Sequence, residues 1–405
     1  MEAYELQMLE GMRAFFSGDT VNCFLGTEDE WQNLWTLCAE QKVAPMVLDV
    51  LAPAAIKRGA APESISAARS HALQSTVGQI QKTHAFLSLY KELCQHGLKP
   101  LVVKGLVCRT LYPKPDLRHS SDEDLLVRED ALPAVLEFFR QKGLTIENED
   151  DEQVITCLDK QTGVYLELHR TLFSSSSQAY GALNRHFEEA FADAISVDVE
   201  DHKVYTLSHS DHAAYLILHS FKHFLHSGFG IRQVCDVCRF VQVYGQEIEW
   251  ERVSRVLDAA SADVFAANLL EIGRCYLGLD QFSENVQKWL ETRKEWLDCE
   301  DLLADLLSGG IYGNNSQVRL HSSRITLNAV AGEKQMGRLL RTIFPPGKDL
   351  AGTYPYLRRH AWLLPIAWGA RIVSYARSDS GAEAKVSVDI GEHRVALMKK
   401  YRVIR

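Results

Sequence analysis

The stretch between Leu98 and His169 constrains the fold most, because short apolar runs alternate there with polar breaks. LKPLVVKG is β-branched and ends in a glycine, which predicts a buried strand. DEDLLV (residues 122–127) predicts a second strand, and further strands are expected around 153–158 and 164–169. A helix cap, helical spacing and a terminal glycine predict a helix over 130–143. Together these patterns predict a small α+β unit.

Helical patterns flank this unit on both sides. Residues 1–60 show helical apolar spacing, and a long helical pattern over 64–95 ends before Gly97 and Pro100. From about Tyr205 onward only helical patterns recur. We therefore predict three parts: an N-terminal helical segment (1–63), an α+β core (64–204) and a mostly α-helical C-terminal domain (205–405).

Composition limits the class of protein. At 405 residues, with 46% apolar and 24% charged residues, the chain has the composition of a soluble globular protein of two or three domains. A net charge of -9 argues against an extended nucleic-acid-binding surface. The odd number of cysteines, 9, and the lack of an apolar N-terminal segment predict a cytoplasmic protein. No apolar run reaches the length of about 20 residues that a transmembrane helix needs.

Two predicted strands carry acidic residues where apolar ones would be ordinary. Residues two apart in a strand point to the same face, so Asp122 and Asp124 are expected side by side, with Glu123 on the other face, solvated or salt-bridged. Glu167 in VYLELH is a third carboxylate in an apolar strand. Two adjacent carboxylates repel each other unless a cation lies between them, and Mg²⁺ binds such oxygens. If the strand of Glu167 neighbours that of the two aspartates, the third carboxylate joins them. Taken alone, however, a D-x-D pair is also typical of a turn or a cap.

The residues upstream make a phosphate site the better interpretation. Lys104 and Gly105 follow the first strand directly, where a lysine supplies charge and a glycine lets the backbone approach a phosphate. Arg118 precedes Asp122 in a Pro-bounded loop that could fold over a triphosphate.

A family resemblance rests on these residues. The run LVVKGLVCRTLYPKPDLRHSSDEDLLV resembles the uncharacterised nucleotidyltransferase family of the polymerase-β-like superfamily. LELHR, LHSFKHF and YLRRHAWLLP are similar to that family too, so the resemblance extends over roughly residues 70 to 400. It departs from the superfamily at Lys104–Gly105, where Gly-Ser or Gly-Gly is usual.

The resemblance implies a small mixed sheet with helices, and transfer of a nucleotidyl group from an NTP with release of pyrophosphate. It implies Asp122, Asp124 and Glu167 as catalytic, metal-binding residues for Mg²⁺ or Mn²⁺. Lys104, Gly105, Arg118 and Ser121 are the expected nucleotide-binding residues. ATP is the expected NTP, and the acceptor is a small molecule, a protein or a peptide.

Histidines of the helical part are further candidates. His219 and His223 lie one helical turn apart, and they are possible pocket residues together with the neighbouring Lys222. The alternative for the two histidines is structural or interhelical hydrogen bonding. Two alternatives to an active enzyme stay open: a catalytically silent nucleotide-sensing or partner-binding module, and a protein-nucleotidylating toxin or its antitoxin-like partner.

Overall fold

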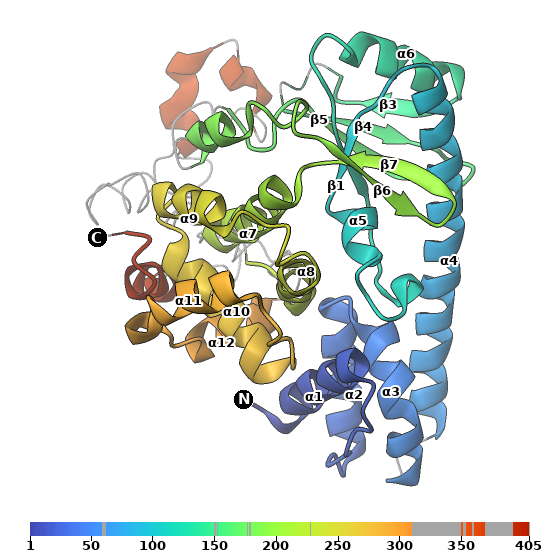
Figure 1. Ribbon diagram of the computed structural model, residues 1–405. Helices are drawn as coiled ribbons and strands as arrows, with labels where there is room; N and C mark the ends of the chain where they lie inside the picture. The colour runs from blue at the N-terminus through green and yellow to red at the C-terminus, as the bar shows by residue number, and fades with distance from the viewer. Residues whose placement is uncertain are drawn as a thin grey trace.

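The computed structural model describes most of the chain (Figure 1). The described residues are 1–58, 62–149, 151, 153–175, 177, 180–226, 228–309, 350, 354–358, 360–368 and 392–404. Residues 310–349 and 369–391 belong to the predicted helical C-terminal domain, and this portion of the prediction lies outside the described residues.

Four helices form the N-terminal part. They are α1 (Ala3–Ser17), α2 (Glu28–Glu40), α3 (Ala44–Lys57) and α4 (Pro62–Gln95). Thr27 and Glu30 form a capping box at the start of α2, each side chain accepting the backbone N–H of the other. The long α4 runs from the bundle of α1–α3 along the side of the sheet (Figure 1). The helical prediction for this region is confirmed.

A mixed five-stranded sheet forms the core, with strand order β1-β2-β5-β4-β3. Its strands are β1 (Leu101–Val103), β2 (Glu123–Leu126), β3 (Thr145–Glu147), β4 (Val154–Leu158) and β5 (Tyr165–His169). β2 is parallel to β5 and antiparallel to β1, and the other pairs are antiparallel. The short α5 (Gly105–Arg109) follows β1, and α6 (Leu132–Gln141) connects β2 to β3. The predicted α+β class is confirmed, and β3 is an addition to it.

A two-stranded sheet, which was not predicted from the sequence, supports β1. It consists of β6 (Ile195–Val199) and β7 (His202–Thr206), which pair antiparallel. The hydroxyl of Thr206 donates to the carbonyl of Val102 in β1 (2.6 Å). The predicted domain boundary at residue 204 falls inside β7, so this strand joins the α+β core to the helices that follow.

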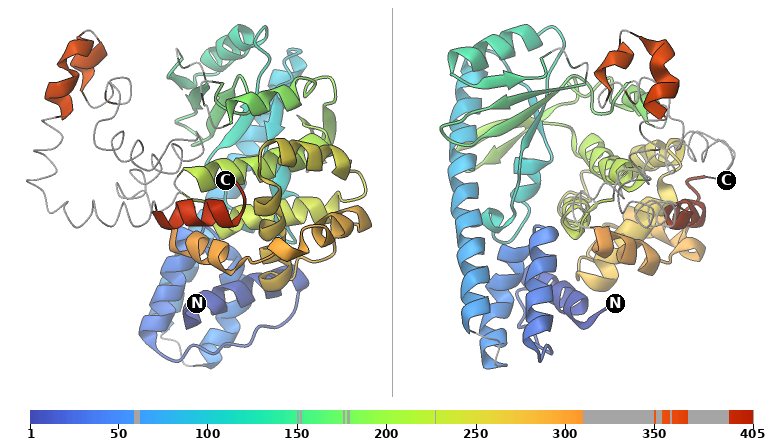
Figure 2. Two further views of the ribbon diagram at one scale, coloured as in Figure 1. Left: turned by 90° about the vertical axis from the view of Figure 1, so that its left-hand side faces the viewer. Right: turned by 180° about the vertical axis from the view of Figure 1, so that it is seen from behind.

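In the described residues up to Gly309, six α-helices follow the hairpin. They are α7 (His209–Leu225), α8 (Ile231–Val243), α9 (Trp250–Ala259), α10 (Asp263–Tyr276), α11 (Glu284–Glu291) and α12 (Glu300–Gly309). Residues 392–400 form a helix that returns to this group (Figure 2), where Arg394 donates to the carbonyls of Phe224 and His226 at the end of α7. Short 3-10 helices are η1 (Pro115–Leu117), η2 (Gly181–Phe187), η3 (Lys294–Trp296), η4 (Pro355–Arg358) and η5 (Ala361–Leu363).

One contiguous apolar core joins the three predicted parts. It contains Trp31 from α2, Leu125 from β2 and Phe224 from α7, each almost fully buried. Burial of this shared surface fixes the helices against the sheet. Among the described helices, none combines the length and apolar character needed to cross a bilayer.

Candidate functional site

A cavity of about 210 Å³ lies between the sheet and the helices α7 and α8. The sheet side contributes residues from the β1–α5 junction, the loop before β2, and the strands β2, β4 and β5: Lys104, Gly105, Arg118, Ser120, Asp122, Asp124, Val154, Glu167 and His169. The helical side contributes Leu216, His219, Ser220, Lys222, His223, Arg232, Gln233, Asp236 and Val237. Segments more than a hundred residues apart in sequence therefore enclose one charged space.

The three predicted carboxylates all line this cavity. Asp124 in β2 is the register partner of Glu167 in the parallel strand β5, and Asp122 directly precedes β2. His169, two residues after Glu167, lies on the same face of β5. Ligand atoms of Asp124, Glu167 and His169 lie within 4.8 Å of one another, a spacing that one metal ion can bridge.

The Lys104 ammonium and the His169 imidazole both contact the Asp124 carboxylate. Lys104 Nζ lies 2.9 Å from Asp124 Oδ1, and His169 Nε2 donates to the same oxygen at 2.8 Å. Burial opposes ionisation of Asp124, but the Lys104 ammonium and the His169 hydrogen bond outweigh it and keep the pKa of Asp124 below its ordinary value. Burial likewise favours neutral His169, yet its hydrogen bond to Asp124 and the nearby Glu167 carboxylate raise the pKa of the imidazole.

Asp122 lies in a different electrostatic environment. Burial and the nearby Asp124 charge raise the pKa of Asp122 to about 6. Its side chain makes no hydrogen bond or ion pair with any residue in the described part of the chain. A half-buried carboxylate beside a second one is a favourable place for a cation.

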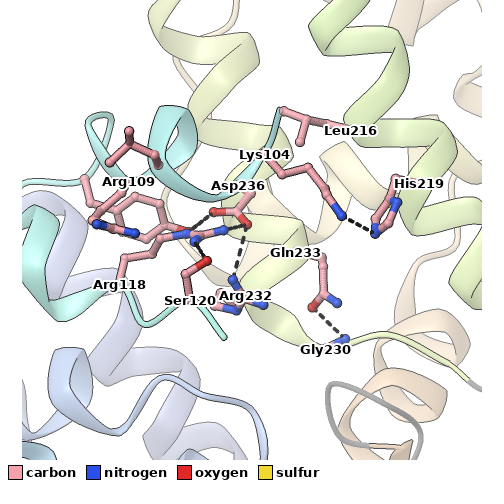
Figure 3. Close-up of polar contacts among 12 residues, drawn as sticks. Lys104, Arg109, Arg118, Ser120, Leu216, His219, Gly230, Arg232, Gln233 and Asp236 are labelled. Carbon is pink, nitrogen blue, oxygen red and sulfur yellow. Dashed lines mark hydrogen bonds and ion pairs between the residues drawn. The ribbon is translucent and has the colours of Figure 1, made fainter. Parts of the chain in front are cut away.

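The backbone of Lys104 turns the chain from β1 into α5. Its φ of 59° is rare for a non-glycine residue. The Lys104 N–H donates to Nε2 of the buried His212 (3.1 Å), which keeps that imidazole neutral and the turn in place. The side chain consequently enters the cavity, where Nζ lies 3.4 Å from His219 Nε2 (Figure 3).

The two predicted histidines form a pair. His223 Nε2 lies 3.0 Å from His219 Nε2. If His219 Nε2 accepts from the Lys104 ammonium, the proton between the two rings belongs to His223. Burial and the charges of Lys104 and Lys222 lower the pKa of both rings, that of His223 to about 3. Both histidines are therefore neutral at physiological pH and line the cavity. The hydrogen bond between them lies within α7 and is not interhelical.

The family model of the uncharacterised nucleotidyltransferases matches residues 27–278, more than half of the chain. The chain belongs to this family. The match begins well before the resemblance noted from the sequence and ends before YLRRHAWLLP, and it contains every candidate site residue.

No curated protein matches the chain. Among solved structures, it aligns with the crystal structure of an antigenic nucleotidyltransferase-like protein from Paracoccidioides brasiliensis, at 12% identity and a TM-score of 0.31. That alignment covers 55% of this chain and 96% of the other.

Gly105 lies against a protein carboxylate in this member of the nucleotidyltransferase family. A Cβ at this position would overlap Oε2 of Glu123, which accepts the Leu106 N–H at 2.8 Å. Glu123 is itself buried and ion-paired with Arg109 (2.7 Å). Of the two environments expected for Glu123, the salt-bridged one is thus confirmed. The glycine is explained by this internal contact, and its predicted role beside a phosphate stays a prediction.

Arg118 is engaged with the helical domain. Its Nε and Nη2 donate to the two carboxylate oxygens of Asp236 in α8 (3.0 and 2.6 Å), and Nη1 donates to Ser120 (Figure 3). Tyr112 donates to the same carboxylate at 2.7 Å. Arg118 borders the cavity, but its guanidinium group is bound to the Asp236 carboxylate. The sequence had predicted a triphosphate as its partner.

The residues that line the cavity differ from the predicted site residues in two further places. Ser121 is exposed and is not part of the cavity lining, whereas the buried Ser120 is. His169 was missed, although the alternation in LELH places it on the face of Glu167, by the same rule that paired Asp122 with Asp124.

Proposed function

We propose that this protein is a metal-dependent nucleotidyltransferase that transfers an NMP group from an NTP, most favourably ATP, to an acceptor hydroxyl or phosphate. The acceptor is a small molecule or a protein or peptide. One observation carries the proposal: Asp124 and Glu167 are register partners on adjacent parallel strands, with Asp122 beside them, in one cavity of a nucleotidyltransferase family member.

The donor set fits Mg²⁺ or Mn²⁺. We assign Asp122, Asp124 and Glu167 as the metal ligands because they offer carboxylate oxygens to one space. Both contacts of Asp124 use Oδ1, which leaves Oδ2 to accept a cation. His169 would orient Asp124 through its hydrogen bond to Oδ1 or enter the ligand set itself. When bound, the ion supplies positive charge that offsets the negative charge of the phosphates.

The proposed reaction is an in-line displacement at the α-phosphorus. An acceptor oxygen forms the new P–O bond, the bond from the α-phosphorus to the α,β-bridging oxygen breaks, and pyrophosphate leaves. When the acceptor is a hydroxyl, its proton must pass to a base. We assign that base to Glu167, because its half-buried carboxylate lines the cavity and has only a distant contact, 3.6 Å, with His169. Asp122 and Asp124 then have no proton-transfer role.

Incubation with α-labelled NTPs, Mg²⁺ or Mn²⁺, and pools of metabolites or proteins tests this reaction. We expect label transfer and pyrophosphate release by the wild type, both lost in Asp124→Asn and Glu167→Gln. Asp201→Asn, on the exposed β6–β7 turn, is the matched control and should retain both. Release of orthophosphate or a nucleoside diphosphate would contradict nucleotidyl transfer. Nucleotide binding without any turnover would favour the sensing module.

A further inference from the structure

The two expected phosphate-binding elements on the sheet side are already occupied. Glu123 accepts the N–H of Leu106 at the start of α5 and fills the space beside Gly105. Arg118 has a bidentate partner in Asp236. A polyphosphate would have to displace a buried protein carboxylate at either place, and breaking a buried ion pair is unfavourable.

Two other cations of the cavity have room for an anion. Lys222 projects from α7, and no carboxylate among the described residues lies within ion-pair distance of it. Its Nζ lies over the ring of Tyr180, 5.9 Å from the ring centroid. Burial and the charge of Lys104 lower the pKa of Lys222, as expected for an ammonium without a counter-ion.

Arg232, near the start of α8, is similarly unsatisfied. Its Nη1 lies 3.9 Å from Asp236 Oδ2, an oxygen that Arg118 already approaches at 2.6 Å (Figure 3). Its Nε is buried without a hydrogen-bond partner. A buried donor without a partner costs free energy unless a ligand, water or ion satisfies it. Arg232 thus has both charge and hydrogen-bonding capacity to offer.

We propose that Lys222 and Arg232 bind the polyphosphate of the nucleoside triphosphate, in place of the start of α5 and Arg118. The inference rests on the proposed function for the identity of its ligand. The carboxylates lie on the opposite, sheet side of the same cavity, so the nucleotide would extend from the acids at its α-phosphate toward α7 and α8 at its β- and γ-phosphates.

Binding measurements with ATP, AMP and inorganic tripolyphosphate in the presence of Mg²⁺ test this assignment. Lys222→Met and Arg232→Gln should each weaken binding of ATP and tripolyphosphate by about 10-fold or more, since each removes charge-assisted hydrogen bonds. Binding of AMP should change much less, so the preference for ATP over AMP should shrink. Lys222→Arg should largely retain the preference for ATP over AMP.

Exposed cations outside the cavity provide matched controls. Lys203→Met on β7 and Arg255→Gln on α9 should leave all three affinities unchanged. A misfolded variant would lose AMP and ATP binding alike, and its thermal unfolding would reveal it. An unchanged ATP-to-AMP preference in both cavity variants would overturn the inference, even if Asp124-dependent transfer is observed. Tripolyphosphate binding that depends on both cations, without nucleotidyl transfer, would support the anion site and reject the proposed function.

Discussion

The carboxylate of Glu123 occupies the space that a side chain at residue 105 would need, so Gly105 and Glu123 are fitted to each other. Glu123 there accepts the Leu106 N–H and pairs with Arg109. This contact fixes the β1–α5 turn from which Lys104 reaches Asp124. A charged residue on the far face of the D-x-D strand thus supports the site without lining it.

Gly105→Ala should destabilise the fold. The added methyl group would displace the buried Glu123 carboxylate, and overpacking of this kind typically costs about 1–3 kcal/mol. Urea unfolding measures the loss. Gly78→Ala is the control, because Gly78 lies inside α4 with open space beside it. That change should stabilise the protein slightly, by about 0.5–1 kcal/mol. Equal stabilities of the two variants would contradict the contact.

Arg118→Met should unfold more easily because it leaves the Asp236 carboxylate buried without its main partner. Breaking a buried ion pair costs about 3–5 kcal/mol. The double variant Arg118→Met/Asp236→Leu should recover part of this loss in the same unfolding measurement. If Arg118→Met keeps its stability and loses only nucleotide binding, then the triphosphate contact predicted from the sequence is the better account.

Stability should fall as the pH is lowered below about 6.5, in part because of His212. Burial lowers the pKa of His212 to about 3, and its ring accepts the Lys104 N–H and contacts Thr206. Between pH 6.5 and 3 the unfolded chain binds a proton that the folded state excludes, so the free energy of unfolding decreases with falling pH. One such histidine contributes about 1.4 kcal/mol per pH unit. Unfolding of His212→Gln should show a shallower dependence, and an identical slope would exclude this role.

The strands around the acids were predictable because their signal is local. LVVKG and DEDLLV are short apolar runs with polar ends, and the period-two rule placed Asp122 and Asp124 together. The same rule applied to LELH would have added His169. The hairpin β6–β7 also has a local signal, with alternating β-branched residues on both sides of Glu200, whose φ is 51°.

Partners distant in the sequence could not be assigned in this way. Arg118 has the same surroundings in the sequence whether a phosphate or a protein carboxylate neutralises it. Only the packing of α8 against the β2 loop brings Asp236 to its guanidinium. That Lys222 has no ion-pair partner among the described residues, and Arg232 only a distant one, likewise becomes evident only from the folded structure.

Thermal unfolding with each NTP, with and without Mg²⁺, tests the central claim most directly. Asp122→Asn is the informative variant, because it removes a cavity charge without breaking a described hydrogen bond or ion pair of that side chain. Asp201→Asn is the control. At pH 8 and 100 times its dissociation constant, an NTP should stabilise the wild type and the control by about 2.7 kcal/mol, only with Mg²⁺. Asp122→Asn should lose this shift. Equal stabilisation without Mg²⁺, or an undiminished shift in Asp122→Asn, would contradict a metal-dependent nucleotide site at these carboxylates.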